Sequence, residues 1–460
     1  MKKMAIAFSV VLLLVEAQCL CKADEKSDLA KDNAELRKRV ENLEKELSEL
    51  KRIVTQQGEQ LKTSEAKPET SAGWKPQKGD IEKISKMIQS QEQKKPLWSD
   101  LDIQLYGYLK LDAAYDTSRI NNGNYAKWVE SESANKDDNQ FNMTANQSRI
   151  GLRINGPEDG GIKTSGCVEV DFYGGGAENK SNIMMRHAYM KIDWPEDNFN
   201  IIAGQTSDVI SPLYPSTLNY SVGWWAGNIG YRRAQIRLTK GLKLSNDIDL
   251  KIEAAVARTI GRDTTLVPAS ESGEDAGFPG IQGRTSLIFP LLSYKPTTLG
   301  FSGHWAKEEY DTSLSGSDKH FDSWSLNLDL TQPISKWLTL KGELFTGENL
   351  SAYLGGIGQG VNIARLKEIG SRGGWMAAAL GPWDKWAFNL GVSIDDVDDD
   401  DLSSISGDKR EYNRSVFGNA IYTINKNTRI GLELSQWHTD YQSQRDSDSI
   451  RAQTSFIYKF

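Results

Sequence analysis

The sequence predicts an all-β transmembrane barrel of 16 antiparallel strands, preceded by an α-helical coiled-coil extension. From residue 101 to the C-terminus, apolar and polar side chains alternate, as they do in a strand whose two faces meet different surroundings. The connections between these strands are short and long by turns. Before residue 101, apolar residues instead recur with a spacing near 3.5, which is typical of a coiled coil.

Residues 1–23 have the features of a secretory signal peptide. Two lysines precede a short apolar core, Met4–Val15, and small residues surround a cleavage site after Ala23. Cleavage after Ala17 is the alternative. A lipid anchor at Cys19 or Cys21 is less favoured, because neither cysteine follows the small residue that such a signal needs. The mature chain is therefore expected to be exported.

Residues 24–62 are expected to form a coiled coil that lies in the periplasm. Two interleaved sevenfold series support this interpretation: Leu29, Leu36, Leu43 and Leu50, and Asn33, Val40, Leu47 and Val54. A single amphipathic helix packed on a domain is the alternative, and the residues of the second series do not distinguish a dimer from a trimer. Residues 63–100 are expected to be a linker and a short amphipathic helix.

Composition excludes several other classes. After the signal, no apolar run reaches the roughly 18 residues that a membrane-spanning helix needs, and the mean hydropathy is -0.52. A net charge of -7 argues against a nucleic-acid partner. Cys167 is the only cysteine after the signal, so no disulfide framework is expected.

Residues 101–460 are predicted to form the barrel, with strands long enough to cross a bilayer when tilted. The last strand alternates from Ile450 and ends in aromatic residues up to Phe460, which are favoured at a membrane interface. The predicted strands are 102–116, 141–155, 161–173, 183–194, 199–207, 231–240, 247–258, 282–290, 297–307, 320–332, 337–346, 371–380, 385–395, 412–424, 428–440 and 449–460.

The connections sort into two sets. The short ones are rich in turn-forming residues, such as 195–198 and 425–427, and the long ones include 117–140, 208–230 and 347–370. Outer-membrane barrels have short periplasmic turns and longer extracellular loops, whereas a soluble sandwich has no reason to sort its loops in this way. The chain is therefore expected in the bacterial outer membrane, surrounded by lipid.

Four motifs occur in a characteristic order. They are Phe141–Ile154 (FNMTANQSRIGLRI), Glu169–Phe172 (EVDF), Arg186–Tyr189 (RHAY) and Ala203–Gln205 (AGQ). In these motifs, over roughly residues 102–240, the chain resembles the DcaP-like porins. The resemblance implies a homotrimer of 16-stranded barrels with the coil in the periplasm. It also implies diffusion of small anionic solutes, dicarboxylates among them, through an arginine-bearing constriction.

Strand alternation predicts which charged side chains face the lumen. If Ile150, Leu152 and other apolar residues face lipid, their polar neighbours face inward, since a charge on the lipid face near the bilayer midplane costs about 2–4 kcal/mol. Rings of cationic side chains select anions. The alternative is that the arginines pair with lumen carboxylates and brace the wall. The predicted pore-lining residues are Arg149, Arg153, Lys163, Glu169, Asp171, Arg233 and Arg237.

By the same resemblance, the connection 208–230 should fold into the lumen and narrow it. Its candidate constriction residues are Tyr214, Tyr220, Trp224 and Trp225. The alternative is a surface loop that packs against neighbouring subunits.

No catalytic or metal site is expected, and no cofactor. The acidic run Asp395–Asp401 lacks the spaced glycine and terminal glutamate of a calcium loop, so it is interpreted as a solvated loop. The four histidines lie in separate strands or rims; a barrel hydrolase with a serine and a histidine on adjacent strands is the remaining enzymatic alternative.

The predicted function is a non-enzymatic outer-membrane porin for small hydrophilic solutes. The competing hypothesis is a structural barrel anchor that ties the envelope to the cell wall through its coiled coil, with little transport.

Overall fold

The computed structural model describes residues 101–460, except 136, 175–179, 261–275, 293, 312–317 and 406–407. The chain divides into two units, Met1–Gln93 and Lys94–Phe460, and every described residue lies in the second. The predicted signal peptide, coiled coil and linker lie outside the described residues. No helix among the described residues is long and apolar enough to cross a membrane.

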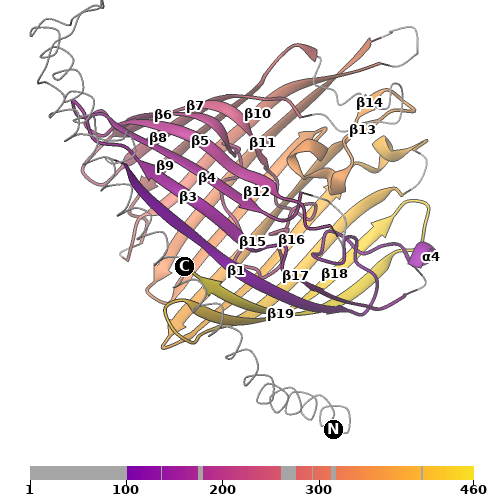
Figure 1. The fold of residues 1–460 in the computed structure, drawn as a ribbon. Helices are drawn as coiled ribbons and strands as arrows, with labels where there is room; N and C mark the ends of the chain where they lie inside the picture. The colour runs from indigo at the N-terminus through magenta and orange to yellow at the C-terminus, as the bar shows by residue number, and fades with distance from the viewer. Residues whose placement is uncertain are drawn as a thin grey trace, which may run out of the picture. The chain divides into compact units, whose positions relative to one another are not determined.

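Seventeen strands form one antiparallel sheet that closes on itself (Figure 1). Strands β2 and β3 follow one another along β1 and share one place in the wall, which therefore has 16 strand positions. The strands are β1 (Asp102–Asp116), β2 (Gln140–Thr144), β3 (Arg149–Asn155), β4 (Lys163–Asp171), β5 (Met184–Trp194), β6 (Phe199–Ser207), β7 (Arg232–Lys243), β8 (Asp249–Ala257), β9 (Gly280–Phe289), β10 (Thr297–Asp311), β11 (Asp318–Ser335), β12 (Leu338–Glu348), β15 (Gly370–Trp383), β16 (Trp386–Val397), β17 (Arg410–Thr423), β18 (Thr428–Tyr441) and β19 (Ser447–Lys459).

The first and last strands close the barrel. Leu109 of β1 lies opposite Tyr458 of β19, and Leu105 of the same strand lies opposite Leu152 of β3. All other neighbours in the wall follow one another in the chain. A closed wall leaves no unpaired strand edge, which is a requirement in lipid. The prediction of a 16-stranded antiparallel barrel is confirmed.

The two faces of the wall differ as the alternation predicts. Outward-facing side chains such as Leu105, Ile236 and Leu432 are large, apolar and exposed, while inward-facing ones such as Glu169 and Ser455 are polar and buried. Exposed apolar side chains that continue around a whole wall need a lipid environment. The wall is thus apolar outside and polar inside.

The connections lie at two different ends of the strands. We call one the short-turn end, which includes turns 195–198, 336–337 and 424–427, and the other the long-loop end. Short elements accompany the long loops: α4 (Glu132–Asn135), η3 (Ser351–Tyr353), η4 (Gly356–Gly358), η5 (Asp399–Leu402), β13 (Val361–Asn362) and β14 (Lys367–Glu368).

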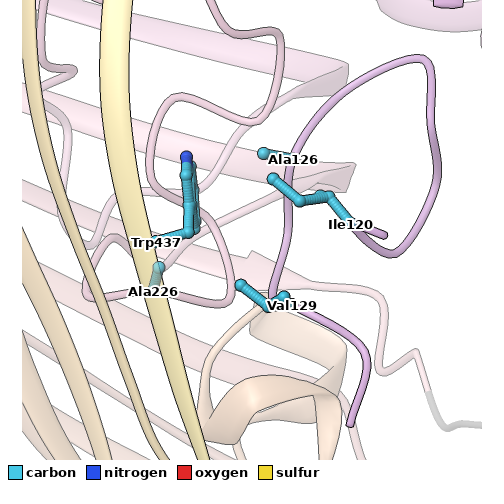
Figure 2. Close-up of a cluster of buried hydrophobic side chains, with 5 residues drawn as sticks. All are labelled: Ile120, Ala126, Val129, Ala226 and Trp437. Atoms are coloured by element: carbon cyan, nitrogen blue, oxygen red, sulfur yellow. The ribbon is translucent and has the colours of Figure 1, made fainter. Parts of the chain in front are cut away.

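Three of the long loops fold into the barrel instead of remaining outside it. They are the first loop (117–139), the inner loop (208–231) and the sixth-hairpin loop (349–369). Figure 2 shows Ile120 and Val129 of the first loop packed with Ala226 of the inner loop against Trp437 of β18. In the sixth-hairpin loop, apolar residues including Leu350 are fully buried. These loops fill much of the interior near the long-loop end.

Candidate functional site

The inner loop crosses the lumen and is bound to the opposite wall by a buried carboxylate. Glu433 of β18 accepts hydrogen bonds from the Thr217 hydroxyl at 2.6 Å and the Leu218 backbone N–H at 2.7 Å. It also accepts one from the Asn419 amide of β17 at 2.9 Å. Charge-assisted hydrogen bonds of this kind are stronger than neutral ones. Glu433 therefore fixes the middle of the inner loop.

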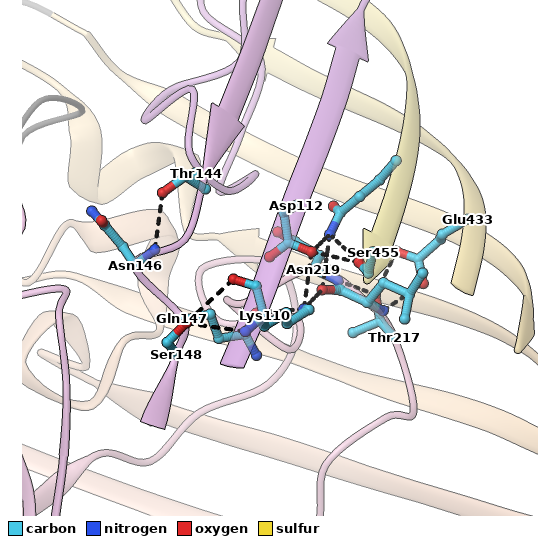
Figure 3. A network of polar contacts seen from close by, with 12 residues as sticks. Lys110, Asp112, Thr144, Asn146, Gln147, Ser148, Thr217, Asn219, Glu433 and Ser455 are labelled. Atoms are coloured by element: carbon cyan, nitrogen blue, oxygen red, sulfur yellow. Dashed lines mark hydrogen bonds and ion pairs between the residues drawn. The ribbon is translucent and has the colours of Figure 1, made fainter. Parts of the chain in front are cut away.

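Strands β1 and β19 provide the other half of this attachment (Figure 3). The carbonyl oxygen of Leu218 accepts from Lys110 Nζ at 2.7 Å and from Gln453 Nε2 at 3.0 Å. Lys110 also contacts Asp112 and Gln147, at 3.2 and 2.6 Å. Both backbone groups of one loop residue are thus paired with the wall, which holds this segment in a single register.

A second carboxylate holds the start of the same loop. Glu343 of β12 accepts from the Leu213 backbone N–H at 2.7 Å and from the Trp375 indole at 3.0 Å. The backbone carbonyl of Trp225, near the other end of the loop, accepts from Asn413 of β17 at 2.8 Å. The inner loop is consequently attached along its length.

The predicted aromatic residues of the inner loop lie in one cluster. Tyr220 and Trp224 are buried with Tyr125 of the first loop and Tyr173 after β4, and Trp225 packs against them. Tyr214 is exposed, although its ring lies 6.3 Å from that of Trp224. Aromatic edges and faces in such arrangements attract each other.

The predicted lumen carboxylates are paired with arginines. Arg186 of β5 donates from Nε to Glu169 at 2.8 Å and from Nη1 to Asp171 at 2.7 Å. Arg149 lies 3.4 Å from the same Glu169 oxygen, and the Tyr220 hydroxyl donates to Asp171 at 3.2 Å. These contacts brace β3, β4 and β5 and join the inner loop to them.

Arg186 could not be placed on a face from the sequence, because residues on both faces of its strand are apolar. The structure explains why. The register of β4 with β5 shifts between Glu169 and Val170, so that Glu169 pairs with His187 and Val170 with Met185. A bulge of this kind re-aims side chains, and Arg186 points into the lumen.

The predicted arginines of β7 have different environments. Arg233 is 1 % exposed and forms an ion pair at 2.7 Å with Asp208, which is fully buried. Its guanidinium also lies over the Tyr353 ring at 3.8 Å. Arg237 is partly exposed and donates to the Ser207 carbonyl and to Gln235; within the described ranges it forms no ion pair. Arg233 has a wall-bracing environment and Arg237 a lumen-facing one.

The remaining predicted cations lie towards the short-turn end. Arg153 is exposed and lies over the Tyr106 ring at 4.3 Å, and none of the described carboxylates pairs with it. Lys163 lies 3.3 Å from Glu158 at the rim. Other inward-facing, partly or fully exposed cations at this end are Lys191, Lys243, Lys251, Lys341, Arg429 and Lys459, against the carboxylates Asp102, Asp193 and Asp249. Exposed positive charge predominates here.

One serine–histidine arrangement on adjacent strands is present, and its geometry does not suit catalysis. His304 of β10 lies with one ring nitrogen 2.7 Å from Ser325 Oγ and the other 3.1 Å from Ser323 Oγ. All three side chains are buried. A nucleophile needs access to substrate, and its histidine needs an orienting group on the second nitrogen. Here both nitrogens face serines.

No group of three or more histidine, cysteine or carboxylate residues in the described ranges could hold a metal ion. In the acidic run, Asp395 is fully buried, and Asp401 accepts from Lys367 Nζ. These two members are therefore part of the fold, and not of a solvated loop as the sequence predicts for the whole run.

Comparison with known proteins gives a family and a fold. A family model described as DcaP outer membrane protein matches residues 76–255, and none of the curated proteins matches the sequence. The crystal structure of the outer membrane channel DcaP of Acinetobacter baumannii is 19 % identical, with a TM-score of 0.63 over 79 % of this chain and 98 % of that chain. An anion-selective porin from Comamonas acidovorans is 13 % identical, with a TM-score of 0.50 over 78 % of this chain and 100 % of that chain. The chain is therefore similar in fold to outer-membrane channels, and the DcaP family model matches it over residues 76–255.

Proposed function

We propose that the protein is an outer-membrane porin that allows passive diffusion of small hydrophilic solutes. The observation that carries this proposal is the closed wall, which is apolar on its outer face and polar on its inner face. In the outer membrane, the short turns of such a barrel face the periplasm and its long loops face the outside of the cell. No step of this function requires a cofactor or a chemical reaction.

Anions, including dicarboxylates, are the proposed solutes. Arg153 and Arg237 reach the lumen, and in the described part of the chain neither is paired with a carboxylate. Lys341 and Arg429 add positive charge near the short-turn end. Cations along a pore lower the barrier for anions while holding them weakly. The carboxylates Glu169 and Asp171 do not oppose this, because Arg149 and Arg186 neutralise them.

The proposed assembly is a homotrimer, as the family resemblance implies, with the coiled coil of residues 24–62 in the periplasm. If the coil aligns the three barrels, a chain without residues 28–62 should form fewer trimers. An intact trimer after this deletion would show that the coil is not needed for assembly.

Conductance in planar bilayers tests the function. The mature chain should give stepwise openings in potassium chloride, with a reversal potential that favours chloride over potassium. Liposome swelling with dicarboxylates, amino acids and sugars then identifies the solute class. A barrel that inserts but carries no current would contradict the porin.

Such a sealed barrel would support the structural anchor. The loops packed inside the barrel favour that second candidate, because Val129, Ala226 and Ile357 are all fully buried in the interior. A wide pore requires open space at every level, whereas here the long-loop half is densely filled. The conductance measurement therefore decides between the two functions.

A further inference from the structure

A groove in the outer face of the wall crosses strands β15 to β19, which follow one another in orange and yellow in Figure 1. It has a volume of about 660 Å³ and a mainly apolar lining, and pockets of this size hold small ligands. Gly418 of β17 lies between Leu390 of β16 and Leu434 of β18. These two leucines are 54 and 63 % exposed, so they stand on either side of a floor that has no side chain.

The groove repeats this arrangement along the wall. Ala420 of β17 lies opposite Leu432 of β18, and on the far side of that strand Thr454 of β19 lies opposite the same leucine. Small outward-facing side chains thus alternate with large ones across the groove. A gap beside an apolar surface forfeits dispersion contacts, so a flexible apolar chain that enters the groove gains contacts that a flat wall does not offer.

Aromatic side chains mark the end of the groove that is nearer to the short turns. Phe388 lines the groove, and its ring lies 6.1 Å from that of Trp386 and 6.0 Å from that of Trp383. Trp386 also lies 4.8 Å from Tyr422. Aromatic girdles of this kind lie at the membrane interface. The groove therefore begins at the interface and continues towards the interior of the membrane.

The length of the strands gives the depth of the groove. Ala420 precedes Lys426, in the turn that follows its strand, by six residues. Six residues span about 20 Å along a strand at about 3.3 Å each. With a strand tilt of about 45°, this corresponds to about 14 Å along the membrane normal, close to half of a hydrocarbon core about 30 Å thick. The groove thus lies within the leaflet next to the short turns.

Two exposed lysines lie in the turns that connect these strands. Lys385 is in the turn between β15 and β16, and Lys426 is in the turn between β17 and β18. The Lys385 Nζ lies 6.0 Å from the centre of the Tyr422 ring, at the aromatic end of the groove. Asp384 is the one acidic residue in these two turns. The charge at this end is therefore positive.

We propose that the groove binds one acyl chain of an anionic glycerophospholipid of the periplasmic leaflet, with its phosphate group beside Lys385 and Lys426. The depression receives the chain, the aromatic rings lie at the level of the glycerol, and the lysines attract the head group. Each lysine near an anionic membrane surface contributes roughly fivefold to binding. This inference depends on the outer-membrane orientation of the barrel and not on conduction, since a sealed barrel would bind the lipid equally well.

A second copy of the chain is the competing occupant, because a homotrimer is the proposed assembly. The lysines favour the phospholipid, which brings a negative charge to the level at which they lie. A neighbouring barrel would fill the apolar floor without providing such a charge.

The test is native mass spectrometry of the mature chain, folded in a non-ionic detergent and titrated with dioleoylphosphatidylglycerol or dioleoylphosphatidylcholine. The wild type should bind one phosphatidylglycerol per barrel, at a half-saturating concentration about fivefold lower than that of phosphatidylcholine, since the net charge of the two turns is about one. Ala420→Leu fills the floor and should raise the half-saturating concentration of both lipids about tenfold, the effect of about two methylene groups losing contact. Lys385→Gln combined with Lys426→Gln should abolish the preference for phosphatidylglycerol and leave phosphatidylcholine binding unchanged.

Two matched controls make the same chemical changes elsewhere. Ala254→Leu adds the same side chain to the outer face of β8, where Ala254 is exposed. Lys295→Gln removes an exposed lysine from the turn between β9 and β10. Both controls should bind the two lipids as the wild type does.

The outcomes separate the lipid site from its alternatives. Equal binding of the two lipids by the wild type, or equal binding by Ala420→Leu and Ala254→Leu, would overturn the proposal. A wild-type trimer that Ala420→Leu converts to monomers, with no lipid bound to either, would assign the groove to a second copy and overturn it too. Thr454→Leu fills the part of the groove over β19 and decides the question if Ala420→Leu does not fold. A barrel that binds phosphatidylglycerol in this way but carries no current would refute the porin and support the lipid site.

Discussion

Replacing Glu433 with alanine should release the middle of the inner loop from the wall. Glu433 is 3 % exposed and accepts two hydrogen bonds from the loop, one from the Thr217 hydroxyl and one from the Leu218 N–H. Hydrogen bonds to a charged group are worth about 1.5–3 kcal/mol each. The two together suggest a loss of about 3–6 kcal/mol in the free energy that docks this segment.

The lower end of this range is the better expectation, because Lys110 and Gln453 still bind the Leu218 carbonyl. A loss of about 3 kcal/mol raises the undocked population roughly 100-fold. An undocked segment moves within the lumen, so we expect larger open-channel current noise and a larger mean conductance in potassium chloride. Planar-bilayer recordings of single channels measure both quantities.

Two variants control for loss of a buried carboxylate as such. Glu433→Gln keeps one acceptor oxygen, so its noise should lie between those of the wild type and the alanine variant. Glu253→Ala removes a buried wall carboxylate that pairs with Arg284 and Lys251, at a place where no inner-loop contact is involved. If Glu433→Ala gives the same noise and conductance as Glu253→Ala, the reasoning about loop attachment is wrong.

Three other substitutions test the wall and the lumen. Asp208→Asn leaves Arg233 as a buried charge without its partner, which should lower the free energy of unfolding by about 3–5 kcal/mol. The variant should therefore unfold at a lower temperature, measured as the temperature at which the fast-migrating folded barrel disappears from a gel. An unchanged temperature would contradict this. Arg153→Gln should shift the reversal potential towards potassium with little change in that temperature, since the side chain is exposed, and an unshifted potential would remove Arg153 from the selectivity proposal. Leu432→Arg places a charge on the outer face, where the leucine is 57 % exposed. It should destabilise the barrel in lipid vesicles by about 2–4 kcal/mol, as measured by urea titration. An unchanged midpoint of that titration would mean that this face does not contact lipid.

The strands could be predicted from the sequence because each has two faces in different surroundings. The predicted first strand, 102–116, has the same bounds as β1, and the predicted fifth, 199–207, has the same bounds as β6. The predicted strand 141–155 is interrupted, since it forms β2 and β3 with Ala145–Ser148 between them. The Ser148 N–H there donates to the Ala145 carbonyl, and across this turn the outward-facing apolar residues change from odd positions, such as Phe141 and Met143, to even ones, such as Ile150 and Leu152.

The contents of the lumen were predicted less completely, because no period marks a loop that folds inward. Resemblance indicated the inner loop, but nothing in the sequence indicated that the first and sixth-hairpin loops also enter the barrel. Their buried residues, such as Ile120 and Leu350, are single apolar positions among polar ones. Likewise Glu433 and Glu343 gain their importance from partners in the inner loop that are more than 100 residues away.

The adjacent arginines Arg232 and Arg233 on β7 show that ion pairing, and not charge alone, decides whether an arginine stabilises the wall or can attract a solute. Arg233 faces the lumen as the alternation predicts, but Asp208 neutralises it, so an approaching anion meets little net charge there. Arg232 has the wrong parity for the lumen, yet its guanidinium enters the aromatic cluster, and within the described ranges it has no carboxylate partner. A cation can attract a solute anion only to the extent that its own chain has not already satisfied it. By this criterion, and because Arg232 is only 3 % exposed, selectivity should depend on Arg153 and Arg237 more than on Arg233, and three separate arginine-to-glutamine variants compared by reversal potential would test that order.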